Sequence, residues 1–375
     1  MKVGVPKEIV DGENRVALVP EALGSLLKGG MQILVERGAG EGAFLPDGAY
    51  KEAGAILVPD ARGLLSQVDV VLKVQAPALN MTLGQHEVDL IREGAVLITF
   101  LQATSHPDVV QRLIERKITS FSMDCIPRIA RAQKMDALSS QSTVAGYKAV
   151  LTAASSTGKF FPMLVTAAGT VPPAKVLVLG AGVAGLQAIA TARRLGAIVQ
   201  AYDVRPAVKE QVESLGGTFV ELDLAGDETE DASGYARELT QEAQEQEKVL
   251  LHRHVPQVDI VITTALIPGK RAPILITREM VQEMKDGSVI VDLAAETGGN
   301  CELTEPGEVV TRHGVTIHGP LNVPSTMPMH ASYMYSRNVS SLLLHLVRNG
   351  QLELDFDDPI TNDTCITHDG RVRHP

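Results

Sequence analysis

The chain has 375 residues, more than the roughly 100–200 that one domain usually needs, so two domains are expected. Hydrophobic residues make up 45% of the sequence and charged residues 21%, which is ordinary for a globular protein and argues against extended disorder. The formal net charge of −11 argues against nucleic acid as a partner, because it would repel phosphate.

Cysteine usage and hydropathy exclude several other classes of protein. Cys125, Cys301 and Cys365 are widely separated and form no CxxC pair, so neither a disulfide framework nor a metal site is predicted. The N-terminal "MKVGVPKEIVDGENR" lacks the pattern of a signal peptide. The longest apolar stretches, such as "GAVLITFLQA", are shorter than the ~18–20 residues needed to cross a bilayer. We expect a cytoplasmic protein with no direct insertion into a membrane.

In the N-terminal half of the chain, short β-branched runs alternate with amphipathic, helix-like segments such as "PEALGSLLKGG" and "HPDVVQRLIERK". The predicted strands are "KVGVP", "QILVER", "AILVP", "DVVLKVQ", "AVLITFL" and "ITSFSMD". Alternation of this kind predicts a parallel sheet that helices cover on both faces.

A polar stretch, "PRIARAQKMDALSSQS" at residues 127–142, follows the last of these strands and precedes a helix-like run. Its polar side chains include those of Arg128, Arg131, Gln133, Asp136, Ser139 and Ser140. One interpretation is purely structural, with a salt bridge between Arg128 and Asp136 and with Ser139 capping the next helix. The other interpretation is that the stretch lines a binding site.

The strand and helix rhythm starts again at Lys175 with "KVLVLG", "AIVQAYD", "TFVELD", "DIVITTA", "SVIVDLA" and "VTIHG". Residues 139–165 are expected to form a helix that joins the two halves, and the helix-like run after residue 328 could return to the first. The predicted fold class is α/β, with two doubly wound, parallel-sheet, Rossmann-like lobes and a cleft between them. The predicted lobes are residues 1–138 with about 330–375, and residues 139–329.

The most specific motif is "VLVLGAGVAGLQAIATARRLG", in which Gly180, Gly182 and Gly185 follow a strand and open a helix at Val183. Glycines at this spacing allow a tight turn, the approach of a pyrophosphate to the backbone, and close packing of helix on strand. The helix N-terminus then offers unpaired N–H groups to the phosphates. The motif predicts a dinucleotide site.

Asp203 ends the strand after this motif. A carboxylate there would accept hydrogen bonds from a ribose 2′-OH and repel a 2′-phosphate, which favours NAD over NADP. Arg205 is a counter-signal, because a guanidinium could hold a 2′-phosphate. The structural alternative is that Asp203 only caps a helix or turn.

The segment from Glu221 to Lys248 holds ten acidic residues against two basic ones, a local charge of −8. Two interpretations stay open at this point. The segment could be the solvated face of an acidic helix, or it could be a mobile or partner-facing loop.

Four motifs together resemble a known family over nearly the whole chain: "VGVPKE...ENRVALVP", "VLKVQAP", "GAGVAG" and "VIVDLAAETGGN". This family unites alanine dehydrogenases with the NAD(H)-binding subunit of proton-translocating nicotinamide nucleotide transhydrogenase. Arg15 and Lys73 match the family's carboxylate-binding positions. However, Gln102 stands where alanine dehydrogenases carry a catalytic histidine, and Glu296 where they carry an aspartate. Because glutamine cannot exchange a proton near neutral pH, the resemblance favours the transhydrogenase branch.

In that branch, a loop with the order Arg, Gln, Asp, Ser lies over the nicotinamide end of NAD(H), and residues 127–142 resemble it. The resemblance implies that Gln133 contacts the nicotinamide ribose and the incoming NADP(H), and that Asp136 orients Arg128 through an ion pair. Ser139 would add a hydroxyl near the carboxamide.

The same resemblance implies roles for residues around the adenosine half. Residues 227–248 match a long mobile loop of the family, in which Gly234 and Tyr235 would close on the nucleotide. Asp203, Val204 and Arg205 would hold the adenosine ribose and its edge. Leu266, in "ITTALIPGKRAP", would be an apolar contact of the adenosine.

The chain has one dinucleotide motif and no predicted membrane span, so the resemblance implies that other subunits bind NADP(H) and cross the membrane. The expected protein is the separate soluble alpha-type subunit of a split enzyme. It would be a homodimer held through its partners at the cytoplasmic face of the cell membrane. Two alternatives remain: a free-standing dehydrogenase for alanine or another amino acid, and a non-catalytic module that senses NAD.

Overall fold

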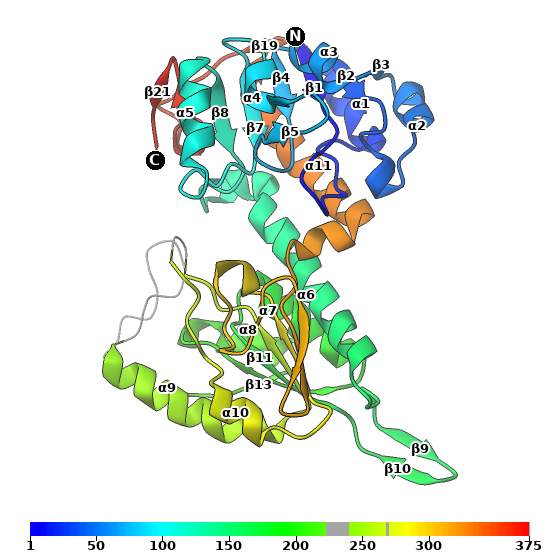
Figure 1. The fold of residues 1–375 in the computed structure, drawn as a ribbon, viewed down its shortest axis with the longest axis vertical. Helices are drawn as coiled ribbons and strands as arrows, with labels where there is room; N and C mark the ends of the chain where they lie inside the picture. Colours follow the sequence, from blue (N-terminus) through cyan, green and yellow to red (C-terminus); the bar gives the residue numbers. More distant parts are fainter. Residues whose placement is uncertain (223–239, 268–269, 375) are drawn as a thin grey trace. The chain divides into compact units, whose positions relative to one another are not determined.

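The computed structural model describes residues 1–222, 240–267 and 270–374. The chain divides into two compact units, which Figure 1 shows in ribbon form. Unit 1 comprises Met1–Gln141 and Pro324–Pro375, and unit 2 comprises Ser142–Val323. Unit 2 is therefore an insertion between two segments of unit 1 in the sequence. Among the described residues, no helix combines the length and the apolar character that crossing a membrane requires.

Within the described residues of unit 1, an eight-stranded sheet forms the centre. Across the sheet the strands are β21 (Arg371–Val372), β20 (Cys365–His368), β8 (Thr119–Ser122), β7 (Val96–Thr99), β4 (Val70–Leu72), β1 (Lys2–Val5), β2 (Gln32–Glu36) and β3 (Ile56–Val58). The strands from β8 to β3 are parallel. By contrast, β20 runs antiparallel to β8 and β21 antiparallel to β20.

Helices cover both faces of this sheet. They are α1 (Pro20–Lys28), α2 (Asp47–Glu52), α3 (Ala61–Leu65), α4 (Glu87–Leu90), α5 (Pro107–Glu115), α11 (Pro328–His345) and α12 (Pro359–Thr364). Alternate residues of β4 point to opposite faces, so Val70 and Leu72 join one hydrophobic cluster and Val71 joins another. Tyr335 of α11 lies in the first cluster. Helix α11 therefore completes the core of unit 1. Two short hairpins also belong to this unit, β5–β6 (Leu79–Asn80, Gln85–His86) and β18–β19 (Val347–Arg348, Gln351–Leu352).

Unit 2 has a seven-stranded sheet among its described residues. In spatial order the strands are β13 (Thr218–Phe219), β12 (Ile198–Tyr202), β11 (Lys175–Leu179), β14 (Ile260–Thr263), β15 (Val289–Asp292), β17 (Val315–His318) and β16 (Val309–Arg312). All neighbours are parallel except β16, which runs antiparallel to β17. The buried, β-branched strands in the middle are typical of a sheet covered on both faces.

The helices of unit 2 are α7 (Val183–Arg194), α8 (Lys209–Ser214), α9 (Gln241–His254) and α10 (Arg278–Glu283). Helix α6 (Ala137–Ser156) begins in unit 1 and ends in unit 2. Its Gly146 packs against the first turn of α7, because a Cβ there would lie 2.0 Å from the Ala184 carbonyl oxygen. A glycine is required at this helix crossing.

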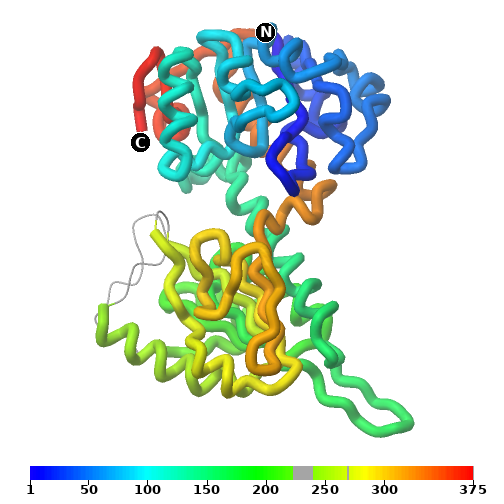
Figure 2. The backbone as a smooth tube through the Cα atoms, in the orientation of Figure 1, coloured from blue at the N-terminus to red at the C-terminus, as the bar shows by residue number. Residues whose placement is uncertain are grey.

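The predicted α/β class with two doubly wound lobes is confirmed, but the sheets are mixed rather than purely parallel. The antiparallel strands β16, β20 and β21 were not predicted. Strands β16 and β21 are short and have no buried residue. Strand β20 is a four-residue strand that directly follows helix α12 and has no alternating pattern of burial. The predicted helix at 139–165 ends at Ser156, and a hairpin of β9 (Leu164–Thr166) and β10 (Gly169–Val171) follows it. Figure 2 shows this hairpin projecting from the body of unit 2.

The acidic segment is partly helical. Thr240 caps α9 by accepting a hydrogen bond from the Ala243 N–H, and Ala243, Glu247 and Leu251 form the buried face of the helix. The match of residues 227–248 to a loop is therefore wrong for the segment from Gln241 onward. The preceding residues, 223–239, lie outside the described stretches of the chain.

Candidate functional site

The turn between β11 and α7 contains two glycines that the backbone itself requires. Gly180 has φ +95°, and a Cβ there would lie 2.6 Å from the Thr264 hydroxyl oxygen. A Cβ at Gly185 would lie 1.8 Å from the Gly180 carbonyl oxygen. Any larger residue at either position would therefore collide with the protein.

The middle glycine has a different environment. Gly182 has φ −73° and ψ −168°, an extended conformation that any residue adopts. A Cβ at Gly182 would meet no atom of the described residues within 4 Å. Neither backbone strain nor crowding explains a glycine there. What fits is a ligand that approaches the backbone at the N-terminus of α7, as a pyrophosphate does in dinucleotide sites.

Asp203 lies directly after β12 and is 9% exposed. One carboxylate oxygen accepts a hydrogen bond from the Ala181 N–H at 2.7 Å, which ties Asp203 to the glycine turn. The Arg205 side chain binds the same carboxylate through Nε (2.9 Å) and Nη2 (2.8 Å), and the Arg205 N–H donates to it at 2.9 Å. A ribose hydroxyl would therefore have to share Asp203 with Arg205 or displace it.

The segment after β14 forms a second wall beside the turn. The Thr264 hydroxyl donates to the Gly180 carbonyl at 3.0 Å, and Leu266, two residues on, is 47% exposed. Val204 is half-buried and packs on the core. Because β11, β12 and β14 are parallel neighbours, their carboxyl ends share one edge, where ligands of such sheets bind. The predicted Gly234 and Tyr235 lie outside the described residues.

The loop after β15 reaches the same edge. Its motif "VIVDLAAETGGN" contributed to the family resemblance, but no role for Asp292 was predicted from the sequence. The fully buried Asp292 carboxylate accepts hydrogen bonds from five donors. These are the hydroxyls of Thr263 and Thr304 and the N–H groups of Ala294, Asn300 and Cys301. Glu296, by contrast, is exposed and accepts a hydrogen bond from the Asn322 N–H. The available signal was the aspartate that ends the otherwise apolar strand "VIVD".

The polar stretch 127–142 of unit 1 contains a 3-10 helix, Ala130–Met135, directly before α6. Ala132 and Met135 are buried in the core of unit 1. Arg128 and Gln133 are exposed, and the Gln133 side chain makes no hydrogen bond with any described residue. The stretch is therefore a rigidly packed turn that presents Gln133 to solvent or to a ligand.

Two contacts that the sequence did not predict anchor this turn. Arg131 forms an ion pair with Asp358, at the N-terminus of α12. Burial would raise the pKa of Asp358, but its hydrogen bonds with the Thr361 N–H, His345 and Arg131 lower the pKa to about 2. Asn338 of α11 donates to the Lys134 carbonyl at 2.9 Å. The C-terminal segment of the chain thus holds the turn in place.

Asp136 begins helix α6. Its carboxylate accepts hydrogen bonds from the Ser139 N–H at 2.9 Å and from the Ser139 hydroxyl at 2.5 Å, as an N-terminal cap does. The capping residue is therefore Asp136, and Ser139 donates to it. The ion pair expected between Asp136 and Arg128 stays a prediction.

Unit 1 contains two buried cations, Lys73 and Arg15, that match the family's carboxylate-binding positions. The Lys73 ammonium lies 3.0 Å from Glu8 and 3.0 Å from Glu87, and all three side chains are buried. Glu8 also accepts from the Val74 N–H and Glu87 from the Ala78 N–H. Burial would lower the pKa of Lys73, but the two carboxylates raise it well above its usual value. Burial raises the pKa of Glu8.

Arg15 is the second buried cation. Its guanidinium binds the Glu13 carboxylate through Nε (2.8 Å) and Nη2 (2.7 Å), and Nη1 donates to Gln141 at 2.9 Å. Glu13 also accepts from the Gln75 amide at 2.7 Å. Both cations that match carboxylate-binding positions are thus bound by carboxylates of the same unit.

Gln102 follows β7 and is exposed, with φ +46°. Its N–H donates to the Asp124 carboxylate at 3.3 Å, and the Leu101 N–H donates to the same oxygen at 3.0 Å. The side chain at this position is an amide, so it offers a polar contact but no proton transfer near neutral pH.

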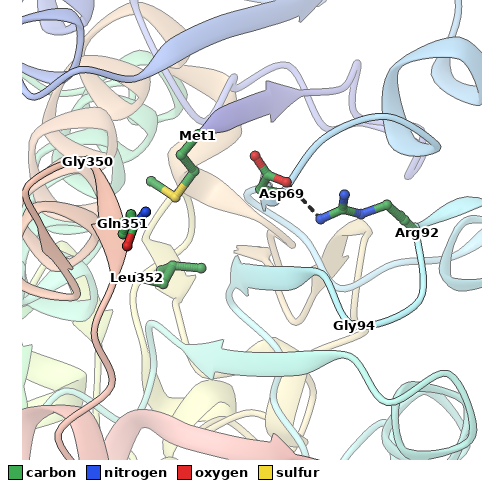
Figure 3. Close-up of a pocket in the computed structure, with 7 residues that line it drawn as sticks. All are labelled: Met1, Asp69, Arg92, Gly94, Gly350, Gln351 and Leu352. Atoms are coloured by element: carbon green, nitrogen blue, oxygen red, sulfur yellow. Dashed lines mark hydrogen bonds and ion pairs between the residues drawn. The ribbon is translucent and has the colours of Figure 1, made fainter.

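Figure 3 shows a shallow pocket of about 300 Å³ at the other end of the unit 1 sheet. Met1 and Asp69, which precede β1 and β4, line it together with Arg92, whose guanidinium lies 2.7 Å from Asp69. Leu352 of β19 closes one side. Because ligands of parallel sheets bind at the carboxyl ends of strands, this pocket is not the candidate site. Among the residues that the structure describes, no cluster of His, Cys, Asp and Glu could hold a metal.

Comparisons with known proteins cover both units. The family model "alanine dehydrogenase/PNT, N-terminal domain" matches residues 4–145, and the corresponding C-terminal domain model matches residues 149–375. The first portion of the split NAD(P) transhydrogenase subunit alpha of Rhodospirillum rubrum is 51% identical over 378 residues, which cover 100% of this chain and 98% of that one. Alanine dehydrogenase 2 of Staphylococcus aureus is 32% identical over 361 residues, 94% of this chain and 89% of that one.

A solved structure of transhydrogenase from Sinorhizobium meliloti is similar throughout, with a TM-score of 0.86 and 42% sequence identity. The similarity covers 100% of this chain and 99% of that one. The resemblance found in the sequence motifs is therefore confirmed over the full length. The chain belongs to the alanine dehydrogenase/PNT family.

Proposed function

We propose that this chain is the NAD(H)-binding subunit of a proton-translocating NAD(P) transhydrogenase. In this function, hydride passes directly between NADH bound to this chain and NADP⁺ bound to a partner subunit. One observation carries the proposal: the match to the first portion of a split transhydrogenase subunit alpha reaches 51% identity over 100% of this chain, whereas the alanine dehydrogenase is 32% identical.

The glycine turn of unit 2 supports nucleotide binding. Gly180 and Gly185 shape the turn, and the open space at Gly182 admits a pyrophosphate to the backbone. The helix that begins at Val183 then directs its first N–H groups at the phosphates. In the proposed complex these four residues hold the middle of the dinucleotide.

The choice of NAD(H) rests on Asp203. Its carboxylate would accept hydrogen bonds from the adenosine ribose and repel a 2′-phosphate, and its link to the Ala181 N–H fixes its place beside the turn. Arg205 would stay paired with Asp203 or move to the edge of the adenosine, with Val204 and Leu266 as apolar contacts. Gly234 and Tyr235 are proposed to close over the same nucleotide on the basis of the family resemblance.

The unit 1 residues support hydride transfer over amino-acid oxidation. Oxidative deamination needs a group that moves protons, and Gln102 cannot supply one. It also needs a cation for the substrate carboxylate. That carboxylate would have to compete with Glu13 for Arg15, and with Glu8 and Glu87 for Lys73. Direct hydride transfer has neither requirement.

For hydride transfer the main task is positioning, because two nicotinamide rings must be held with their reacting atoms about 3–3.5 Å apart. We assign this task to Arg128, Gln133, Asp136 and Ser139. The anchored 3-10 helix presents Gln133 outward, and from the family resemblance we propose that Gln133 contacts both the bound nucleotide and the arriving one. Asp136 and Ser139 fix the start of α6 behind it. Asp136 is also proposed to orient Arg128 through an ion pair, and the Ser139 hydroxyl to lie near the carboxamide.

The proposal includes other subunits. A partner would bind NADP(H), and a membrane-spanning partner would couple hydride transfer to proton movement. The chain is proposed to act as a homodimer, held through these partners at the cytoplasmic face of the cell membrane.

The purified chain provides the first test. It is expected to bind NADH, seen as a change in NADH fluorescence, and to show little turnover alone. Adding an NADP(H)-binding component of a transhydrogenase should start hydride transfer from NADH to an NADP analogue. Absence of transfer in a mixture in which both nucleotides are bound would contradict the proposal.

The second candidate is an alanine dehydrogenase, favoured by the 32% identical relative. It predicts alanine-dependent reduction of NAD⁺ by the chain alone. Gln102 predicts that no such activity is found. The variant Gln102→His tests whether the amide at this position accounts for the absence of alanine oxidation. A gain of that activity would identify residue 102 as the difference between this chain and an alanine dehydrogenase.

A further inference from the structure

Asn300, in the loop after β15, is fully buried and makes three side-chain hydrogen bonds. Its Oδ1 accepts from the Ala265 N–H at 3.1 Å. Its Nδ2 donates to the Ala265 carbonyl at 2.9 Å and to the Pro273 carbonyl at 2.8 Å. Only one orientation of the amide fits this set of one donor and two acceptors, so the arrangement requires an amide side chain.

The backbone of Asn300 is fixed as well. Its N–H donates to the buried Asp292 carboxylate at 2.8 Å, and its carbonyl accepts from the N–H groups of Leu275 and Ile276. Asn300 therefore cannot shift without breaking the loop that Asp292 organises. A side chain held in this way transmits its position to the groups that it binds.

Ala265 is the group that matters for the candidate site. A Cβ at Gly180 would lie 3.1 Å from the Ala265 nitrogen, so Ala265 packs directly on the glycine turn. Asn300 binds the peptide units on both sides of Ala265. It binds the preceding unit through the Ala265 N–H and the following unit through the Ala265 carbonyl. The second of these peptide units leads into Leu266, which is 47% exposed.

We propose that Asn300 is a positioning residue of the nucleotide site, which sets the wall formed by Ala265 and Leu266 against the Gly180 turn. The inference rests on the proposed function, because it assumes that an adenosine occupies this wall. Asn300 does not touch the nucleotide itself. It acts through Ala265.

Two substitutions separate positioning from general stability. Asn300→Ala removes all three bonds. Asn300→Asp keeps the shape but turns an oxygen toward the Ala265 and Pro273 carbonyls. Both variants are expected to weaken binding of NADH and AMP about tenfold, the size expected for losing a buried hydrogen bond. Asn80→Asp is the matched control, because Asn80 is buried in unit 1 and bonds only locally, to the Leu83 N–H.

Acid rescue is the measurement that a merely structural role would not produce. In Asn300→Asp the new carboxyl is fully buried and faces the Ala265 and Pro273 carbonyls, so its pKa should be higher than that of a free aspartate. When protonated, it can again donate to a carbonyl. AMP affinity of this variant, measured below its unfolding temperature, should therefore recover toward the wild-type value as the pH falls from 8 to 5.

The inference is supported if the wild-type chain binds AMP and NADH, both variants lose about tenfold in affinity, and the AMP affinity of Asn300→Asp recovers at low pH. Unchanged AMP affinity in Asn300→Ala, with or without a lower melting temperature, overturns it while leaving the proposed function intact. A wild-type chain that binds neither NADH nor AMP overturns both.

Discussion

The carboxyl ends of the two sheets differ in how their polar groups are satisfied. In unit 1, Lys73 and Arg15 are buried and bound by carboxylates of the same unit. In unit 2, Gly182 leaves open space at the start of a helix. Charged side chains alone therefore do not mark a ligand site. Open space above a glycine that lies between a strand and the N-terminus of a helix is the more specific sign.

The comparison assigns different tasks to the two units. Unit 2 is expected to hold the nucleotide through its backbone, whereas the buried charges of unit 1 hold the scaffold from which Gln133 projects. Substitutions in unit 1 charges should therefore change stability, and substitutions in the glycine turn should change affinity. Five predictions, in order of decreasing effect, test this division.

Lys73→Met should destabilise the protein most. The change leaves the carboxylates of Glu8 and Glu87 buried without their cation, and loss of one partner of a buried ion pair typically costs about 3–5 kcal/mol. Chemical unfolding measures the loss. Lys117→Met, at an exposed ion pair with Glu93, is the control and should change little. Equal stability of the two variants would contradict a structural role for Lys73.

Gly182→Ala should weaken NADH binding at least tenfold, because its Cβ meets no described atom but enters the space left for a ligand. Stability should fall only slightly, because Gly182 is the N-cap of α7 and alanine is a poorer cap than glycine. Gly185→Ala is the contrasting variant. Its Cβ would overlap the Gly180 carbonyl oxygen, so it should lower both stability and affinity. Titration with NADH and thermal unfolding give the two readouts. Full NADH affinity in Gly182→Ala would contradict the assignment of the turn.

Gln133→Asn should slow hydride transfer about tenfold while NADH affinity stays nearly unchanged. The amide remains but is withdrawn by one methylene, and small displacements of positioning groups cost rate. Rapid-mixing kinetics with the NADP(H)-binding component measure the rate. Gln111→Asn on the exposed face of α5 is the control. If transfer by Gln133→Asn is intact, Gln133 has been assigned wrongly.

Asp136→Ala should cost about 1 kcal/mol, the usual value of a helix N-terminal cap. Asp136→Asn sharpens the result, because asparagine caps a helix as well as aspartate but carries no charge. If Asp136 only caps α6, the asparagine variant keeps both stability and hydride transfer. Full stability with slow transfer would instead support the predicted ion pair with Arg128.

Glu247→Gln should raise stability slightly at pH 8 and not at pH 4. Burial raises the pKa of Glu247 above its ordinary value of 4.5, so the native state favours the protonated form. Stability from this group is present below pH 4.5 and is lost as the pH rises through the native pKa. Glu245→Gln, exposed on the same helix, should show no such pH dependence in thermal unfolding.

The sequence predicted the features that depend on local pattern. Buried strands such as "KVLVLG" and "DVVLKVQ" and the glycine turn follow from periodicity and spacing. It did not predict the antiparallel partner of β8, because Cys365–His368 forms a strand only through pairing with residues far away in the chain. Local patterns carry no information about such partners.

The candidate site divides in the same way. Gly180, Gly182 and Asp203 could be predicted as candidates because their spacing is itself the signal. The contacts of Arg131 with Asp358 and of Asn300 with Ala265 were missed, because each joins residues from distant elements. Residues that support a site through contacts between distant elements are therefore identified from the structure and not from the sequence.

The most direct test of the proposed function follows the hydride itself. NADH that carries deuterium at both C4 positions is mixed with this chain, the NADP(H)-binding component and an NADP analogue. We expect the deuterium to appear in the reduced analogue and none to exchange with water, because the transfer is direct. Deuterium released to water, or analogue reduced without label, would contradict direct hydride transfer at this site.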